Sequence, residues 1–175
     1  MVCIMANGAA NNKFIDEKNV AFEVFRNALY IVMANMTRML ARDGEGATKM
    51  IECICSGAPT YEAAAAISKS VISSSLLKCA MFGEDANWGR ILCAIGYADA
   101  DFDINLVDVE IMSEYGSVEV CRGGMGVEFS EEKAKKVLES EEIVIDVRLH
   151  QGMENAAAWG CDLTYDYVKI NGDYR

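Results

Sequence analysis

Two glycines flank a single carboxylate in the stretch Asp43-Gly44-Glu45-Gly46-Ala47-Thr48-Lys49. Glycine tolerates positive φ and close approach of the backbone, so this turn can hold Glu45 at a tight corner within reach of an amine or ammonium ligand. The alternative interpretation is a helix C-cap, in which Gly44 is the left-handed residue that ends a helix and Glu45 is merely solvated. Because such caps are common, the turn alone favours the C-cap, and only further motifs can favour a ligand site.

The same stretch has a superficial likeness to a phosphate-binding loop. That loop needs the pattern GxxxxGK[ST] between a strand and a helix, because backbone amides and the helix N-terminus hold the phosphates. Here a predicted helix precedes the glycines and a predicted strand follows them, with Glu45 where a phosphate would bind. This context argues against a kinase or a nucleotide hydrolase.

Histidine and cysteine offer little further chemistry. His150 is the only histidine, and it lies in a predicted strand, where a lone histidine is usually structural rather than a general base. The seven cysteines contain no CxxC pair, so we expect no metal site. Cys53 and Cys55 share one face of a predicted strand, which is compatible with a redox pair, but their apolar neighbours favour core packing and a reducing compartment.

The composition is typical of one packed domain or two small ones, with 175 residues, 52% of them apolar, and one proline. A formal net charge of −11 repels phosphate backbones and anionic lipids, which argues against nucleic acid and membrane partners. A cationic or amine-bearing small molecule would be attracted instead. The sequence contains no run of 18 apolar residues and no signal peptide, so we expect a cytoplasmic location.

The first hundred residues are predicted to be rich in helix. Residues 1–6 are expected to form a short apolar strand, and a long helix is expected to run from Asp16, as its N-cap, to Arg42. The elements expected to follow are a strand over 48–56, a helix over 61–80 capped by Thr60, and a helix over 91–98.

Residues 101–175 are predicted to be rich in strand. Alternation of apolar and polar residues predicts strands over 103–114, 117–121, 125–129, 142–149 and 161–170. Ser130 is expected to cap a helix between them, and the small residues of 151–160 to form a loop. This order predicts an α/β protein of the α+β type, with helices layered on a mixed, partly antiparallel sheet.

Four stretches together carry a family resemblance: Arg42-Asp43-Gly44-Glu45-Gly46-Ala47-Thr48-Lys49, Glu84-Asp85-Ala86-Asn87-Trp88-Gly89-Arg90, Trp159-Gly160-Cys161-Asp162-Leu163-Thr164 and Tyr167-Val168-Lys169-Ile170-Asn171. The chain resembles the ornithine acetyltransferase family, also called bifunctional glutamate N-acetyltransferase. In that family a precursor cleaves itself before a threonine, which becomes the N-terminal nucleophile of the β chain. The resemblance implies a fold like that of N-terminal-nucleophile enzymes. It also implies that residues 1–175 are a single C-terminal portion of the β chain, helix-rich over 1–100 and strand-rich over 101–175.

The resemblance implies a reaction of arginine biosynthesis. The threonine would take an acetyl group from N2-acetylornithine and pass it to glutamate through an acetyl-threonine intermediate, giving ornithine and N-acetylglutamate. Glu45 matches a substrate-pocket glutamate that would pair with the ornithine ammonium, and Asn171 matches an asparagine that hydrogen-bonds the substrate. No cofactor is implied, although acetyl-CoA would be the acetyl donor if the parent enzyme is bifunctional.

Two departures from the family pattern affect what this chain can do. The threonine nucleophile is expected upstream of Met1. Four threonines of this chain do not replace it, because none follows the cleavage motif and none has a free α-amine: Thr37, Thr48, Thr60 and Thr164. A substrate-binding hydroxyl expected just beyond Arg175 is also missing. We therefore expect the chain to be inactive alone and to work in a hetero-oligomer with the α chain and the N-terminal β segment. The alternative is a non-catalytic module that keeps the fold and binds an amine ligand or mediates oligomerisation.

Overall fold

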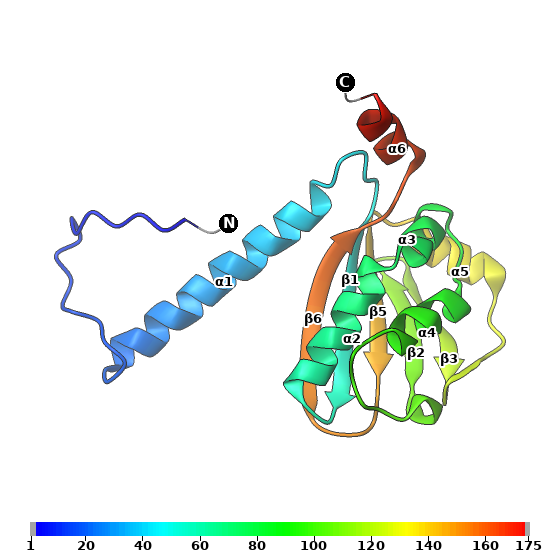
Figure 1. Ribbon diagram of the computed structural model, residues 1–175, viewed down its shortest axis with the longest axis horizontal. Coiled ribbons are helices and arrows are strands. Elements are labelled where there is room, and N and C mark those ends of the chain that lie inside the picture. Colours follow the sequence, from blue (N-terminus) through cyan, green and yellow to red (C-terminus); the bar gives the residue numbers. More distant parts are fainter. Residues whose placement is uncertain (1–2, 174–175) are drawn as a thin grey trace. The chain divides into compact units, whose positions relative to one another are not determined.

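The computed structural model describes residues 3–173, and the chain divides into two compact units, Met1–Met36 and Thr37–Arg175 (Figure 1). In the first unit, residues 3–6 are irregular, so the strand predicted over 1–6 is wrong where the structure describes it, and residues 1–2 lie outside the described residues. Helix α1 (Val20–Arg42) crosses into the second unit, and none of its residues is buried. It begins later than predicted, because Asn19 rather than Asp16 accepts from the Phe22 amide, at 3.1 Å.

The second unit is built on one six-stranded sheet in the order β4-β3-β2-β5-β1-β6. The strands are β1 (Met50–Ala58), β2 (Asp108–Ser113), β3 (Gly116–Arg122), β4 (Met125–Gly126), β5 (Glu142–Arg148) and β6 (Glu154–Cys161). Only β1 and β5 are parallel, and every other neighbouring pair is antiparallel. This confirms the predicted mixed, partly antiparallel sheet.

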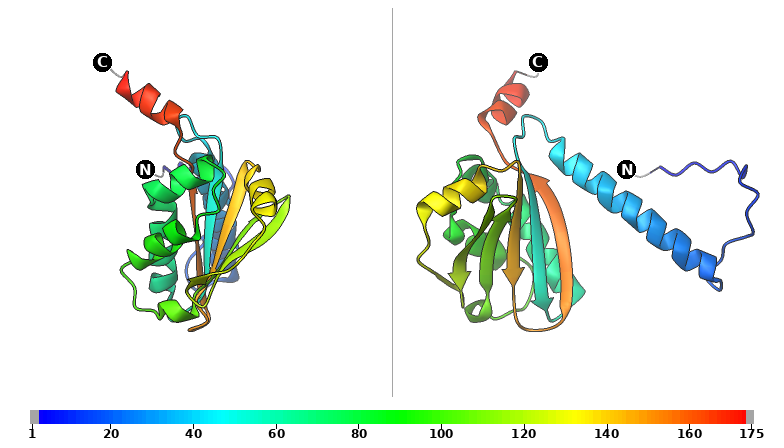
Figure 2. Two further views of the ribbon diagram at one scale, coloured as in Figure 1. Left: turned by 90° about the vertical axis from the view of Figure 1, so that its right-hand side faces the viewer. Right: turned by 180° about the vertical axis from the view of Figure 1, so that it is seen from behind.

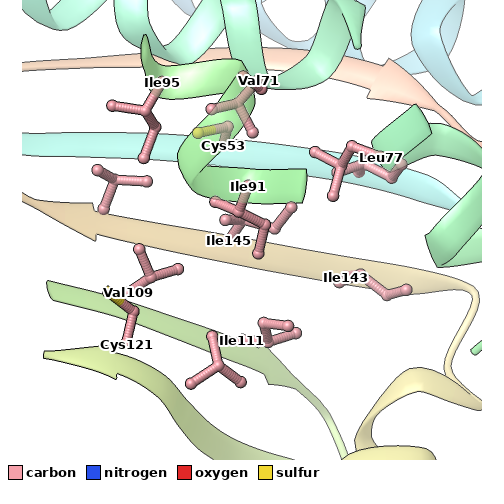
Figure 3. Close-up of a cluster of buried hydrophobic side chains, with 14 of the residues drawn as sticks. Cys53, Val71, Leu77, Ile91, Ile95, Val109, Ile111, Cys121, Ile143 and Ile145 are labelled. Carbon is pink, nitrogen blue, oxygen red and sulfur yellow. The ribbon is translucent and has the colours of Figure 1, made fainter. Parts of the chain in front are cut away.

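Three helices lie along one side of the sheet, as Figure 2 shows: α2 (Tyr61–Ser73), α3 (Ser75–Phe82) and α4 (Trp88–Gly96). The strands present alternate side chains to these helices, because successive residues of a strand point to opposite faces. Ile143 and Ile145 of β5 and Cys53 of β1 meet Val71 of α2 and Ile91 of α4 in the core (Figure 3). Helix α5 (Glu131–Leu138) packs against β2 and β3, and Ser130 caps it as predicted.

Two elements predicted as continuous are interrupted. The helix predicted over 61–80 breaks at Ser74, which ends α2 and whose hydroxyl accepts from the Leu77 amide at 3.3 Å to start α3. The strand predicted over 103–114 begins as a 3₁₀ turn, η1 (Ile104–Leu106), because the Asp103 side chain accepts from the Asn105 amide. The strand predicted over 125–129 is only the two residues of β4.

The end of the chain differs most from the predicted elements. Residues 151–160, predicted as a loop, contribute most of β6, and residues 161–170, predicted as a strand, mostly form α6 (Tyr165–Gly172). Alanine and glycine have low strand propensity, but here they let α2 approach closely: a Cβ added to Gly160 would lie 3.3 Å from the Cβ of Ile72. Tertiary packing therefore decides the strand against local propensity.

Among the described residues, no single helix is long and apolar enough to cross a membrane, and only the pair α2 and α3, bent by 58°, reaches that length and hydropathy together.

Candidate functional site

The glycine-flanked turn lies between α1 and β1. The Ala47 amide donates to the Gly44 carbonyl at 3.0 Å, and Gly46, the third residue of this β-turn, has φ +67°. Gly46 is therefore the left-handed residue, and the interpretation of Gly44 as a left-handed C-cap is wrong. Gly44 is needed for a different reason, because a Cβ on it would lie 2.5 Å from Cys161 Sγ.

The two residues singled out as substrate contacts meet at this turn. Asn171 Nδ2, in α6, donates to Glu45 Oε2 at 3.0 Å and to the Tyr167 carbonyl at 2.9 Å. Glu45 and Asn171 are both exposed and 126 residues apart in sequence. The fold thus brings a carboxylate and an amide together at the surface.

A buried carboxylate fixes the other end of the turn. Asp162, which directly follows β6, accepts from Thr48 N at 2.8 Å, Thr48 Oγ1 at 2.5 Å and Lys49 N at 3.0 Å. Its own amide donates to the Lys49 carbonyl at 3.1 Å. These bonds join the start of β1 to the end of β6, next to the residues that carry Glu45 and Asn171.

Lys49 is also buried, and its ammonium holds the turn to the rest of the unit. Nζ donates to the carbonyls of Leu138 and Ser140 and lies 3.6 Å from Glu84 Oε1. The second motif stretch, which contains Glu84, continues into α4, where the Asn87 side chain accepts from the Arg90 amide at 3.1 Å. All four motif stretches are therefore connected around the turn, which their sequence positions alone do not reveal.

A cavity of about 620 Å³ lies near the start of β5, and its lining includes Arg42, Glu114, Tyr115, Glu141 and Glu142. Arg42 pairs with Glu141 and Glu142, each at 2.6 Å, so part of this acidic lining is neutralised. A second cavity of about 300 Å³ is lined in part by Thr48, Lys49, Phe82 and Glu84. Neither of these two cavities is lined by Glu45 or Asn171, and both residues are exposed.

His150 lies outside the strand predicted to contain it. β5 ends at Arg148, and His150 has φ +57° and its Nε2 lies 2.8 Å from Asp108 Oδ2. Partial burial works to raise the pKa of Asp108, but hydrogen bonds from the Gly123 amide and from His150 outweigh it, so the pKa is lowered. The pair joins β2 to the loop after β5 and has a structural role.

The cysteine pair of β1 belongs to the core. Burial raises the pKa of Cys53 well above its ordinary value, and burial together with the charge of Asp146 raises the pKa of Cys55 to about 12. Both thiols therefore stay protonated. This favours the interpretation that the two cysteines pack in the core over the alternative of a redox pair. Within residues 3–173, no group of histidine, cysteine, aspartate and glutamate side chains could hold a metal ion.

Comparison with known proteins identifies the family. The sequence model of the ArgJ family matches residues 1–175. The chain belongs to the ArgJ family. This confirms the resemblance to the ornithine acetyltransferases that the four motif stretches carry.

ArgJ proteins from several bacteria are close relatives of this chain. It is 50% identical over 175 residues to arginine biosynthesis bifunctional protein ArgJ 1 of Clostridium acetobutylicum, covering 100% of this chain and 43% of the relative. It is 50% identical over 172 residues to the ArgJ protein of Caldanaerobacter subterraneus subsp. tengcongensis, covering 98% of this chain and 43% of the relative. The chain thus spans less than half the length of these curated relatives.

A crystal structure of the ArgJ protein from Bacillus halodurans has the same fold. It superposes with a TM-score of 0.91 at 39% sequence identity, covering 99% of this chain and 80% of that chain. The fold predicted from the family resemblance is therefore confirmed.

Sequence reasoning missed two residues that hold the glycine-flanked turn in place, Asp162 and Thr164. Both lie inside the third motif stretch, so their position was available, but their role was not. The signal for α6 was present in the sequence, because Thr164 followed by Tyr165 and Asp166 is typical of a helix N-cap. A helix that starts there is incompatible with the strand predicted over 161–170.

Proposed function

We propose that this chain supplies the amine-binding part of an ArgJ acetyltransferase. In the proposed reaction, an acetyl group moves from N2-acetylornithine to glutamate through an acetyl-threonine intermediate, giving ornithine and N-acetylglutamate. The nucleophilic threonine belongs to a segment outside this chain, so the chain alone is inactive. The α chain and the N-terminal β segment are its partners, and acetyl-CoA is a second acetyl donor if the complete enzyme is bifunctional.

The contact between Glu45 and Asn171 is the observation that carries this proposal. Within residues 3–173, the Glu45 carboxylate has one hydrogen bond, at Oε2, which leaves Oε1 to accept from the ammonium of the ornithine moiety. Asn171 Nδ2 donates to Glu45 and to the Tyr167 carbonyl, which leaves the side-chain oxygen of Asn171 to accept from a donor of the substrate. The formal net charge of −11 also favours the approach of a cationic substrate.

The test joins the chain to the segments present in its longer relatives and measures acetyl transfer from N2-acetylornithine to glutamate. We expect Glu45→Gln to raise KM for N2-acetylornithine by about tenfold or more, because a charge-assisted hydrogen bond contributes about 1.5–3 kcal/mol. Glu62→Gln, the same change at an exposed position of α2, should leave KM unchanged. Absence of acetyl transfer in the completed protein, or full acetyl transfer with Glu45→Ala, would contradict the proposal.

The same measurements separate the enzyme from the alternative of a non-catalytic module. A module that only binds an amine would bind ornithine through Glu45 and show no transfer when the missing segments are supplied. Calorimetric titration of ornithine into the completed protein, together with the transfer assay, distinguishes these two outcomes.

A further inference from the structure

Thr164 lies where the turn and the start of α6 meet, and its hydroxyl contacts both. Oγ1 donates to the Gly46 carbonyl at 2.6 Å and accepts from the Tyr167 amide at 3.4 Å. The Tyr167 carbonyl in turn accepts from Asn171 Nδ2, which also donates to Glu45. Together with the backbone links from Glu45 to Gly46 and across Tyr167, these four hydrogen bonds close a ring that leads from Glu45 through Thr164 to Asn171 and back.

The helix that carries Asn171 has little else to hold it. α6 has eight residues and none of them is buried, and a helix of this length is marginal in water by itself. Its first residue, Tyr165, packs edge to face on Phe82 with ring centroids 5.6 Å apart. Thr164 itself is only 6% exposed, so its hydroxyl is a fixed anchor rather than a solvated cap.

We infer that Thr164 is a positioning residue for the amine site formed by Glu45 and Asn171, an inference that rests on the proposed function. An N-cap needs only the acceptor side of a hydroxyl. Thr164 also uses the donor side, and it does so on the residue directly after Glu45. One side chain therefore sets the separation between the carboxylate on the turn and the amide on the helix.

The test compares two variants in the completed protein. Thr164→Val keeps the shape and removes the hydroxyl, whereas Thr164→Ser keeps the hydroxyl. We expect KM for N2-acetylornithine to rise about tenfold in the valine variant with a smaller change in kcat, and to stay within about twofold of wild type in the serine variant, since the lost interaction is one of substrate binding. If the valine variant does not fold, Thr164→Ala replaces it.

A matched control separates positioning from helix capping. Thr60 caps α2 in the same way, accepting from the Ala63 amide at 3.1 Å, but it makes no contact with the turn. Thr60→Val should lower Tm as Thr164→Val does and leave KM unchanged. A rise of KM in the Thr60 variant equal to that in the Thr164 variant would overturn the inference.

A double variant shows whether Thr164 acts through Glu45. If it does, Glu45→Gln with Thr164→Val should have the KM of Glu45→Gln alone, because the single effects of coupled residues do not add. A KM raised by the product of the two single effects, or a wild-type KM for Thr164→Val, overturns the positioning role. A wild-type KM for Glu45→Gln instead overturns the proposed function. In that case, hydrogen exchange of residues 44–48 and 165–171 in Thr164→Val tests the ring by itself. Amide protection unchanged from wild type would contradict the ring.

Discussion

Three acidic side chains of this protein do different work because their surroundings differ. Glu45 is exposed and shares one oxygen with Asn171, Asp162 is buried and surrounded by donors, and Asp108 is half-buried beside His150. Only the first has a free carboxylate oxygen at the surface. The residue type alone therefore does not identify the binding group.

Asp108 gives a prediction at the residue scale. Since its pKa is lowered in the folded chain, it stabilises the fold above its unfolded pKa, and this contribution is lost as pH falls through the folded pKa. We expect Asp108→Asn to reduce the free energy of unfolding by about 1.5–3 kcal/mol at pH 7, the usual size for hydrogen bonds to a charged group. Urea unfolding at pH 7 and at about pH 3, below the ordinary aspartate pKa of about 3.9, measures it.

The difference between wild type and Asp108→Asn should shrink at the lower pH. Asp101→Asn, at an exposed position, serves as the control and should change stability little at either pH. An equal difference at both pH values would contradict the assignment of the lowered pKa to this site.

At the scale of elements, the turn and the last strand depend on each other. β1 and β6 are neighbours in the sheet, and Asp162 connects the residues just before one to the residues just after the other. The same connection places α6 beside the turn. The geometry of the candidate site is therefore a property of this junction rather than of either segment.

Removing the Asp162 carboxylate should destabilise this junction strongly. Asp162→Ala leaves the amides of Thr48 and Lys49 without their acceptor, and we expect the free energy of unfolding to fall by about 3 kcal/mol or more, since each unsatisfied buried group costs about 1–3 kcal/mol. Asp162→Asn should cost less, because its amide oxygen still accepts from both. Chemical denaturation measures both, with Asp43→Ala as an exposed carboxylate control in the same turn. Equal losses for alanine and asparagine would rule out this explanation.

Sequence predicted those elements whose pattern and packing agree. The alternation of Glu142 to Arg148 gave β5, and Ser130 gave the start of α5, because in both the apolar residues face the core at the expected period. It failed at β6, where the small residues Ala156, Ala158 and Gly160 share the face that lies against α2, and at α6, where the N-cap Thr164 lies within an apparent strand alternation. In the candidate site, motifs supplied Glu45 and Asn171, but long-range contacts supplied Asp162 and Thr164.

At the scale of the whole chain, the buried apolar residues all belong to the second unit. Within the described residues they run from Met50 to Ala158, and none lies before Thr37. We expect a chain of residues 37–175 to unfold in one cooperative transition with a Tm within a few degrees of the full chain, because no core contact is removed. Thermal unfolding followed by circular dichroism checks this. Loss of the transition would show that residues 1–36 are required for folding.

The order of the strands has a consequence for the growing polypeptide. β1 is synthesised well before its neighbours in the sheet, β5 and β6, whose pairing residues begin at Glu142 and end at Cys161. Until those residues leave the ribosome, both edges of an apolar strand with Cys53 and Cys55 have no partner of their own. Because such distant pairings close late and leave strand edges open, folding of this chain should be slow and sensitive to aggregation, and chaperones should bind the nascent chain around β1.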